Sequence, residues 1–468
     1  MYSGKLKVLT LSLAFIISGC SLIPDYATPE MPVARNWPGS AHTSASSEAG
    51  NVNWESFYQN TDMQHLIRIA LENNRDLRVA ALNVQVAQAR FGVERSALMP
   101  TINAGLSKTA EHLPDNLNST RASGPVTYQQ YQANLATTTW EIDFFGRLRS
   151  LKESAWENYM SQEQTVKAAK LSLVAEVGTA WLSLAADNDL LSLAIDTYKS
   201  QKKSYELIQY GVANGTATEQ DLMQAMMSMK SAEADVSKYS RLLDTDKNTL
   251  TLLLGAEAPD GVFQRATLNK AISFRKLDAG IPSDILTQRP DIIAAEHVLK
   301  SANANIGAAR AAFFPSISIT ASGGTVSDSF SKLFDGGTGA WSFVPTLNIP
   351  IFTGGRNKAN LDIANLSERI EVANYQKAIQ QAFKEVSDSL IGRETYSEEL
   401  KVRNEDNQAS KRYYELASAR FENGVDSYLN VLVAQRSYYQ SHQTLIITRQ
   451  NALLQDIKLY KSLGGGWN

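Results

Sequence analysis

The sequence predicts an α+β fold that is built from two copies of one structural unit. Three observations predict it. Matching residues recur at a spacing of roughly 210 positions, two segments of each copy alternate apolar and polar residues, and long stretches without proline are rich in Ala, Leu, Glu, Gln and Lys. Alternation with a period of two is typical of strands that have one apolar and one polar face, and the long stretches are typical of helices.

The repeat is visible when the two halves of the chain are aligned. Residues of the first half recur in the same order in the second: Asp76, Ala89, Gly92, Arg95, Pro100 and Gly215 match Asp291, Ala304, Gly307, Arg310, Pro315 and Gly424. An internal repeat of this kind indicates duplicated structural units. We expect the first repeat over 63–278 and the second over 279–468.

Each repeat begins with a helical stretch (63–98 and 283–313) that ends at a proline, which stops a helix. A β-hairpin follows in each, over 101–145 and 316–352, with polar loops at 112–126 and 323–340. In the first hairpin the alternation changes phase between Leu135 and Trp140, so we expect a bulge or a change of environment there.

After each hairpin the sequence is helical for about a hundred residues. The stretches 148–208 and 356–419 contain no proline and are expected to form single helices, roughly 90 Å long for sixty residues. Gly215 and Gly424 are expected to reverse the chain into helices 216–254 and 427–463, because glycine adopts the left-handed conformation at a helix C-terminus.

The N-terminus resembles a bacterial lipoprotein signal. Lys5 and Lys7 precede an apolar run over 8–17, which ends in Ser18-Gly19-Cys20, and Cys20 is the only cysteine of the chain. The run is too short to span a bilayer. We therefore expect a signal peptide over 1–19, a covalent lipid on Cys20, and a lipidated, extended N-terminal segment over 20–62. Ser21, rather than Asp, favours sorting to the outer membrane.

The composition offers little support for nucleic-acid binding or catalysis. Of 468 residues, 45 are Lys or Arg and 48 are Asp or Glu, so the net charge of −3 gives no basic surface for a nucleic acid. The five histidines are scattered, and no metal spacing, phosphate loop or nucleophile elbow is found. We expect no enzymatic activity and no cofactor apart from the lipid.

Several charged residues could be catalytic, but a structural role is the favoured interpretation for each of them. Glu141 and Asp143 could form a glycosidase-like carboxylate pair, but an acidic patch that faces a channel is favoured. Arg289-Pro290-Asp291 is interpreted as the start of a helix, because Pro and Asp suit the first turn. Arg95 and Arg310 are expected to form structural ion pairs.

The four predicted strands imply assembly. No other segment approaches ~18 uncharged apolar residues, so a membrane crossing has to be made by a closed barrel. Four strands cannot close a transmembrane barrel, whereas three protomers supply twelve. We therefore expect a trimeric, 12-stranded transmembrane β-barrel, with four strands per protomer, continuous with a long periplasmic α-helical barrel.

Four runs of residues resemble the TolC-like outer-membrane efflux proteins, in the lipoprotein branch typified by OprM: Leu113-Pro-Asp-Asn116, Arg289-Pro-Asp-Ile292, Gly307-Ala-Ala-Arg-Ala-Ala-Phe-Phe-Pro315 and Gly464-Gly-Gly-Trp-Asn468. The resemblance covers essentially the whole chain from Cys20. It implies a homotrimer that docks to a periplasmic membrane-fusion adaptor and an inner-membrane proton-driven (RND-type) pump. The implied function is the outer-membrane exit channel of a tripartite multidrug efflux system.

The same resemblance implies that the channel closes where the helix pairs turn. TolC carries two aspartates in the second tip helix, where this chain has Asn430 and Val433. OprM has a leucine and an aspartate in this stretch; the leucine matches Leu429, and the position of the aspartate is Val433. The candidate gate residues are Asp426, Leu429, Asn430, Val433, Arg436 and Asp221. We expect an apolar gate at Leu429 and Val433, with Arg436 and the acids pinning neighbouring helices. An ordinary coiled-coil core at these positions is the alternative.

Two other functions stay open from the sequence. One is the outer-membrane duct of a type I protein-secretion system. The other, of a different class, is a structural lipoprotein that spans the periplasm. The amphipathic hairpins argue against a spacer, because a spacer needs no strands with a face suited to lipid.

Overall fold

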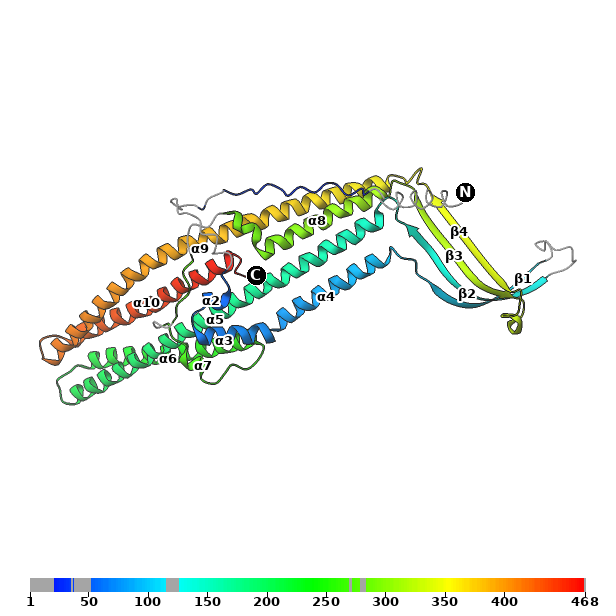
Figure 1. Ribbon diagram of the computed structural model, residues 1–468. Coiled ribbons are helices and arrows are strands. Elements are labelled where there is room, and N and C mark those ends of the chain that lie inside the picture. The colour runs from blue at the N-terminus through cyan, green and yellow to red at the C-terminus, as the bar shows by residue number, and fades with distance from the viewer. Residues whose placement is uncertain are drawn as a thin grey trace. The chain divides into compact units, whose positions relative to one another are not determined.

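The computed structural model describes residues 21–34, 37, 52–114, 126–268, 272–277 and 283–466 (Figure 1). The expected signal peptide and Cys20 lie outside the described residues. Within them one order of elements occurs twice: a helix, two strands, a long helix and a second helix. The first set is α4 (Arg75–Ser96), β1 (Asn103–Leu113), β2 (Val126–Ile142), α5 (Arg147–Ala213) and α6 (Glu219–Leu254). The second is α8 (Pro290–Ala311), β3 (Ser316–Ser327), β4 (Gly339–Asn348), α9 (Arg356–Glu422) and α10 (Tyr428–Ser462).

The chain forms two compact units, and each takes segments from both sequence repeats. Unit 1 comprises Met1–Pro29, Val84–Gln162 and Ala295–Tyr375, and unit 2 comprises Glu30–Asn83, Glu163–Ala294 and Gln376–Asn468. Unit 1 contains the sheet, and unit 2 contains the turns between the long helices.

Four antiparallel strands in the order β1-β2-β3-β4 form the sheet of unit 1. The hairpins form at the expected places, but β3 continues to Ser327, into a segment that was expected to be a loop over 323–340. Gly323 and Gly324 were interpreted from the sequence as loop residues, but they lie in a strand. Gly324 is needed in the strand because a Cβ atom there would lie 2.0 Å from the carbonyl oxygen of Ala133 on β2.

The phase change expected in the first hairpin is a bulge. The pairing of β2 with β3 shifts register between Thr137 and Trp140, and Thr139 has a φ of 51°. A bulged residue reverses which face the following side chains take, so Trp140 and Ile142 continue the apolar alternation in the opposite phase.

The expected long helices are confirmed, because α5 and α9 each run for 67 residues. Among the described helices, α5 has one stretch of 18 residues that is apolar enough to cross a membrane by composition, but 56% of that stretch is buried inside the protein. Burial of this extent is also typical of a core helix, and α5 supplies Trp181 and Leu182 to the core of unit 2.

The helix expected over 63–98 is two helices, α3 (Thr61–Asn73) and α4. Asn74 separates them, because its extended backbone ends α3 while its side chain accepts a hydrogen bond from the Leu77 N–H (2.9 Å) and so caps α4. The Asn74 amide also donates to the Leu253 carbonyl oxygen (2.9 Å), which anchors the break to α6.

The helix expected over 283–313 likewise begins later, at Pro290, after a 3₁₀ turn at Ser283–Gln288. Arg289 is buried and pairs with Asp291 (2.7 Å) and Glu385 (3.0 Å), and it donates to the Ser462 carbonyl oxygen (2.8 Å). The interpretation of this motif as a helix start is confirmed, and the arginine in addition ties three helices of unit 2 together.

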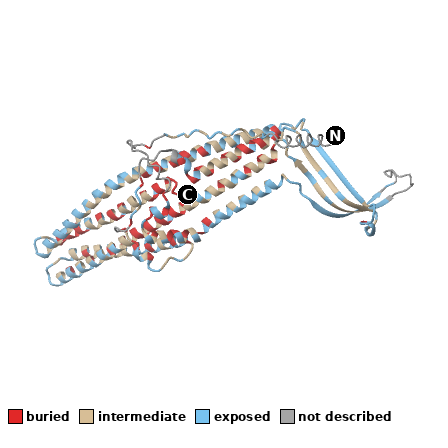
Figure 2. Ribbon diagram, viewed as in Figure 1, coloured by how far each residue is buried: buried red, intermediate tan, exposed pale blue. Residues whose placement is uncertain are grey.

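Buried residues of unit 2 gather around a short helix, α2 (Trp54–Phe57), as the burial colours of Figure 2 show. This helix lies within the segment that was expected to be extended. The Phe57 ring stacks on Tyr460 with 4.3 Å between centroids, and Tyr58 is fully buried beside it. The short elements α7 (Val262–Arg265) and η4 (Phe330–Lys332) complete the described structure.

The interpretation of Glu141 and Asp143 as an acidic patch is wrong, because both carboxylates are neutralised within unit 1. Glu141 forms a bidentate pair with Arg147, with a shortest distance of 2.6 Å. Asp143 pairs with Arg149 (3.1 Å) and accepts the N–H groups of Leu148 and Arg149 at the start of α5. It acts as the N-cap side chain that Gly146, just before the helix, lacks.

Candidate functional site at the helix tips

Two turns of closely similar geometry connect the paired helices of unit 2. Gly215 ends α5 with a φ of 73°, and Gly424 ends α9 with a φ of 71°. In each turn the next residue donates back to the helix, Thr216 to the Gly211 carbonyl oxygen (2.8 Å) and Val425 to that of Arg420 (2.9 Å). This is the hydrogen-bond pattern of a glycine C-cap, as the sequence predicted.

The helix tips pack around a small apolar cluster. Its buried members are Ile208, Ala225, Tyr428, Val431 and Leu432, which come from α5, α6 and α10. Because α10 buries residues 428, 431 and 432 on this side, the residues between them point elsewhere. Leu429 and Val433 are accordingly 51% and 47% exposed, so in the single protomer they are not core residues.

Leu429, Val433 and Arg436 line one cavity of about 510 Å³. Polar side chains of α5 and α6 form its other walls, among them Gln201, Gln224, Ser228 and Asp235. The structure therefore brings three of the six candidate gate residues together along one face of α10. Arg436 is exposed and makes no ion pair with any residue of the described ranges.

Asp426 lies at the start of α10 and is held by its own hairpin. Its carboxylate accepts hydrogen bonds from Arg420 (3.1 Å), from the Ser427 N–H (2.9 Å) and from the amide of Asn430. The hydrogen bond from Asn430, together with those from Arg420 and Ser427, lowers the pKa of Asp426. Asp426 thus pins α9 to α10 within the tip, and sequence reasoning missed Arg420, although it is only six residues away.

Asp221 does not pin a neighbouring helix within the protomer. Its carboxylate accepts the backbone N–H (3.1 Å) and the hydroxyl (2.6 Å) of Thr218, whose side chain in turn accepts the Asp221 N–H (3.2 Å). This reciprocal capping box starts α6. The motif Thr-x-x-Asp could have been read from the sequence as a helix cap.

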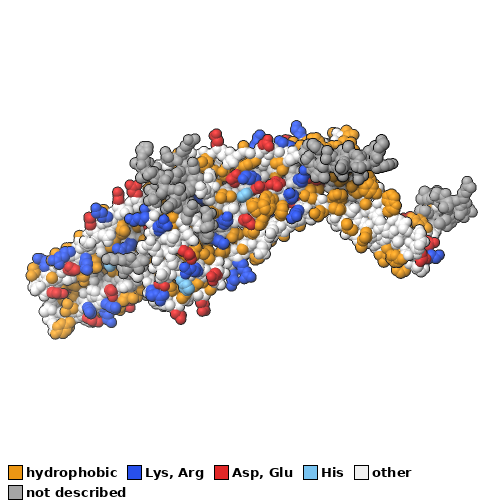
Figure 3. Space-filling model, in the orientation of Figure 1, with side chains coloured by type: hydrophobic (Ala, Val, Ile, Leu, Met, Phe, Trp, Pro, Cys, Tyr) orange, Lys and Arg blue, Asp and Glu red, His pale blue; other side chains and the backbone are white. Residues whose placement is uncertain are grey.

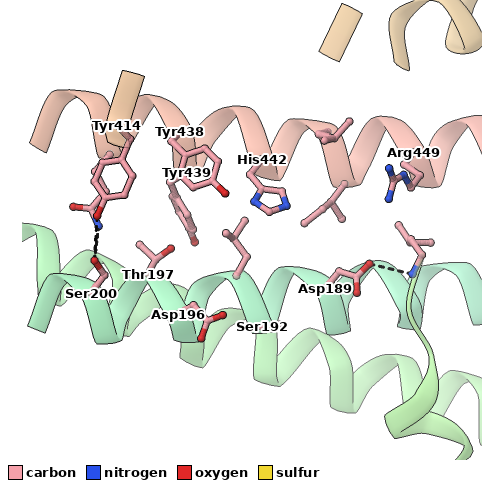
Figure 4. Close-up of a pocket in the computed structure, with 15 residues that line it drawn as sticks. Asp189, Ser192, Asp196, Thr197, Ser200, Tyr414, Tyr438, Tyr439, His442 and Arg449 are labelled. Atoms are coloured by element: carbon pink, nitrogen blue, oxygen red, sulfur yellow. Dashed lines mark hydrogen bonds between the residues drawn. The ribbon is translucent and has the colours of Figure 1, made fainter. Parts of the chain in front are cut away.

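A second cavity of about 420 Å³ lies further along unit 2, between α5 and α10 (Figure 4). Tyr414 and Tyr438 stack along it, and His442 lies beside Tyr438. Burial lowers the pKa of His442. Asp189, on the opposite wall, accepts hydrogen bonds from Thr267 and the Leu268 N–H.

Within the described ranges, the side chains that line this second cavity form no hydrogen-bonded Ser-His-Asp set. The Ser200 hydroxyl bonds with Tyr414 and Gln435, and no hydrogen bond joins it or Asp189 to His442 within the described ranges. In the same part of the chain no cluster of three His, Cys, Asp or Glu side chains could hold a metal ion.

Comparisons with known proteins identify this architecture. The model of the outer membrane efflux protein family matches residues 66–256 and 281–465. The chain belongs to this family. Its two matched segments each contain one hairpin and its flanking helices.

Curated members of the family match over nearly the whole chain. The probable efflux pump outer membrane protein TtgC of Pseudomonas putida is 45% identical over 97% of this chain and 94% of its own length. The outer membrane protein OprJ of Pseudomonas aeruginosa is 37% identical over 98% of this chain and 96% of its own length.

Solved structures of the family share the fold. A membrane protein from Pseudomonas aeruginosa superposes with a TM-score of 0.89, at 37% identity over 96% of this chain and 98% of its own. The MtrE outer membrane channel of Neisseria gonorrhoeae, in its open state, gives a TM-score of 0.86 at 35% identity, over 96% and 98% of the two chains. The predicted α+β channel fold, the outer-membrane location and the function as an efflux channel are confirmed.

Proposed function

We propose that this efflux protein works as a homotrimer, and that it forms the exit channel of a tripartite multidrug system. One observation carries the proposal: the sheet of each protomer has two free edges. Within the described ranges β1 and β4 pair only with β2 and β3. An open strand edge cannot be placed in lipid, because its backbone N–H and C=O groups would have no partners. Three copies that join β1 to β4 give twelve strands and no edge.

The side chains of the sheet suit this placement. β3 and β4 contain no charged residue, and charged side chains are few over the visible face of the sheet (Figure 3). Large apolar side chains of β4 are exposed, with Trp341 at 82%, Phe343 at 58% and Leu347 at 59%. A contiguous apolar surface of this kind indicates contact with lipid or another chain.

The test is conductance of the purified protein in planar lipid bilayers, together with cross-linking of β1 to β4. Cysteines that replace Leu106 and Phe343, one on each edge strand, should join protomers into covalent trimers. The matched pair within one protomer, Leu106 and Ala133, are partners in the β1–β2 register and should give only cross-linked monomers. Monomeric protein without conductance would contradict the proposal.

As its partners we propose a periplasmic membrane-fusion adaptor and an inner-membrane proton-driven (RND-type) pump. Several relatives are named efflux pump outer membrane proteins, some of them for toluene and one for antibiotics. We therefore propose small apolar solutes and drugs as substrates. Deletion of the gene should lower the concentration of toluene and antibiotics that the cells tolerate. In a host that lacks the inner-membrane pump, expression of this chain alone should not restore that tolerance.

The names of these relatives favour drug efflux over type I protein secretion, which the sequence left open. The four strands argue against a structural spacer, because a spacer would leave their unpaired edges and apolar side chains exposed and would have no use for them. Secretion of a reporter protein that depends on this chain would favour the secretion duct instead.

We also propose that Cys20 carries the lipid and that the barrel inserts without it. Acyl chains contribute ~0.8 kcal/mol for each buried methylene, so the lipid anchors the chain firmly. Cys20→Ala with a cleavable signal peptide should still give trimers in the outer membrane. Accumulation of this variant only as soluble monomer would contradict the barrel.

The proposed gate lies at the helix tips. Leu429 and Val433 are half exposed in one protomer and line one cavity with Arg436, so a threefold arrangement would supply rings of apolar side chains. A narrow apolar ring excludes water and ions without a covalent or ionic lock. Asp426 and Asp221 act here as tip supports, and Asn430 fixes Asp426.

A further inference from the structure

The first turns of α6 are rich in methionine. Four of the nine methionines of the chain lie within seven residues there: Met223, Met226, Met227 and Met229. Met227 is 72% exposed, which is the largest value for any methionine that the structure describes, and Met223 is 39% exposed. The thioether sulfur of Met227 is therefore accessible to reagents in solution, and accessible methionines are the ones that oxidants modify.

Met227 also lies in the wall of the cavity at the helix tips. This is the cavity of about 510 Å³ that Leu429, Val433 and Arg436 line. Among the described residues of α6 that line it, Met227 is the only large apolar one; the others are Gln224, Ser228, Ser231, Ala232 and Asp235. The apolar part of the cavity is thus built from both tip helices, with α10 supplying its leucines and valine and α6 supplying Met227.

The internal repeat places Met227 in the same position by a separate argument. At the spacing that separates Gly215 from Gly424, Gln224 matches Val433 and Met227 matches Arg436. All four of these matched residues line the one cavity, so α6 and α10 present equivalent faces to it. The sequence had indicated only Asp221 on α6 as a gate residue, and Asp221 caps the helix without lining this cavity.

Oxidation changes the chemistry of this wall. Hypochlorous acid, an oxidant that donates oxygen, converts a thioether into a sulfoxide: the sulfur gains one oxygen atom and gives up two electrons, the chlorine leaves as chloride, and one proton is released. The product is a polar hydrogen-bond acceptor in place of an apolar sulfur. Arg436 lines the same cavity, is exposed and makes no ion pair within the described ranges, so its guanidinium can donate to the new oxygen.

We propose that Met227 is a modification site at which oxidation to the sulfoxide by hypochlorous acid opens the channel. A narrow apolar constriction stays closed because water does not wet it. A sulfoxide and the water bound to it make the wall polar, so the closed state becomes less stable relative to the open one. The effect on opening rests on the gate proposed above, whereas the oxidation of Met227 does not. A sulfoxide reductase returns the thioether, so the change is reversible.

The first measurement is the sulfoxide fraction at each methionine, determined by mass spectrometry of peptides from the full chain. The protein is purified from the outer membrane and treated with hypochlorous acid. Met99, which is 67% exposed and belongs to unit 1, serves as the reference for an accessible methionine, and Met63, which is 1% exposed, serves as the reference for a buried one. Met227 should be oxidised as rapidly as Met99 while Met63 stays reduced. Oxidation of Met99 without oxidation of Met227 would overturn the modification site.

The second measurement is single-channel conductance of the same samples in planar bilayers. Oxidation should raise the ratio of open to closed wild-type channels about tenfold, which corresponds to about 1.4 kcal/mol for the whole assembly. Met227→Leu keeps an apolar side chain that hypochlorous acid does not oxidise, so it should show no rise relative to its own untreated sample. Any effect of other sulfur atoms persists in this variant. Treatment with methionine sulfoxide reductase should close the oxidised wild-type channel again.

Met227→Gln tests the role of polarity without an oxidant. It places a polar side chain of similar length in the cavity wall, and it should raise the ratio of open to closed channels in untreated protein. Met223→Gln is the matched control, because Met223 is exposed one turn away on the same helix and does not line the cavity. This control variant should behave as the wild type does.

The outcomes separate this inference from the gate on which it rests. An equal response to hypochlorous acid in Met227→Leu and the wild type would overturn the inference. If Leu429→Ala opens the channel while oxidised Met227 and Met227→Gln do not, the apolar gate stands and the inference fails. If oxidation opens the channel through Met227 while Leu429→Ala leaves it closed, the inference stands and the gate does not depend on Leu429.

Discussion

Truncation of Leu429 tests the proposed apolar gate. Full burial of a leucine side chain is worth roughly 1.5–3 kcal/mol, and in one protomer 51% of Leu429 is still exposed and available for closure. Leu429→Ala therefore removes about 1 kcal/mol of closing free energy per protomer, or about 3 kcal/mol in a trimer. The ratio of open to closed channels should rise on the order of a hundredfold.

The assay is single-channel conductance in planar bilayers, supported by uptake of a large antibiotic in cells. Ile447→Ala is the matched control, because Ile447 lies on the same helix, far from the tip, and is 45% exposed. It should leave the closed channel closed. Leu432→Ala should destabilise the tip instead, because Leu432 belongs to the buried cluster.

Salt separates an apolar gate from an ionic one. Screening weakens ion pairs between exposed groups but not apolar contacts, so 1 M salt (a Debye length of ~3 Å) should open the wild-type channel only modestly. A channel that stays shut in Leu429→Ala and opens fully in Arg436→Ala would refute the reasoning and establish an ionic lock.

Three further predictions concern the sheet, a helix start and a pair of acids. Ile319→Arg should lower the stability of the membrane-inserted barrel by ~2–4 kcal/mol per protomer and lower the yield of heat-stable trimers on gels. Ser318→Arg should lower that stability less. If Ser318→Arg were the more damaging variant, the other face of the strand would be the one in contact with lipid. Asp143→Ala removes the cap of α5 and should lower the free energy of unfolding in denaturant by about 1–2 kcal/mol, while Asp196→Ala, an exposed acid of the same helix, should have little effect. Burial, together with Asp246, raises the pKa of Asp187 to about 6 from 3.8, so protonation of Asp187 stabilises the fold at low pH and this contribution is lost as the pH rises through about 6. Asp187→Asn should therefore raise the melting temperature at pH 7.5 and not at pH 4, and an equal effect at both values would contradict the shifted pKa.

Local patterns in the sequence were sufficient for the main elements of this protein, but not for the break at Asn74 or for the short helix α2. Proline-free stretches, period-two alternation and the glycines at 215 and 424 depend on interactions within a few residues, so the long helices, the hairpins and the turns could be predicted. The phase change near Trp140 marked the bulge for the same reason, because alternation records which face each side chain takes.

The tertiary structure decided what depends on residues far apart in the chain. The strand at Gly324 could not be distinguished from a loop, since the reason for glycine is the approach of Ala133, nearly 200 positions earlier. From the sequence, the carboxylates of Glu141 and Asp143 were interpreted as an unpaired acidic patch. In the structure they form ion pairs with Arg147 and Arg149. Gly92 and Gly307 occupy matching positions of the two repeats, but only at Gly307 would a Cβ atom meet other residues, Ile23 and Ser150 at 2.6 Å each. The sequence pattern cannot show this difference, because a close contact depends on both surfaces that meet.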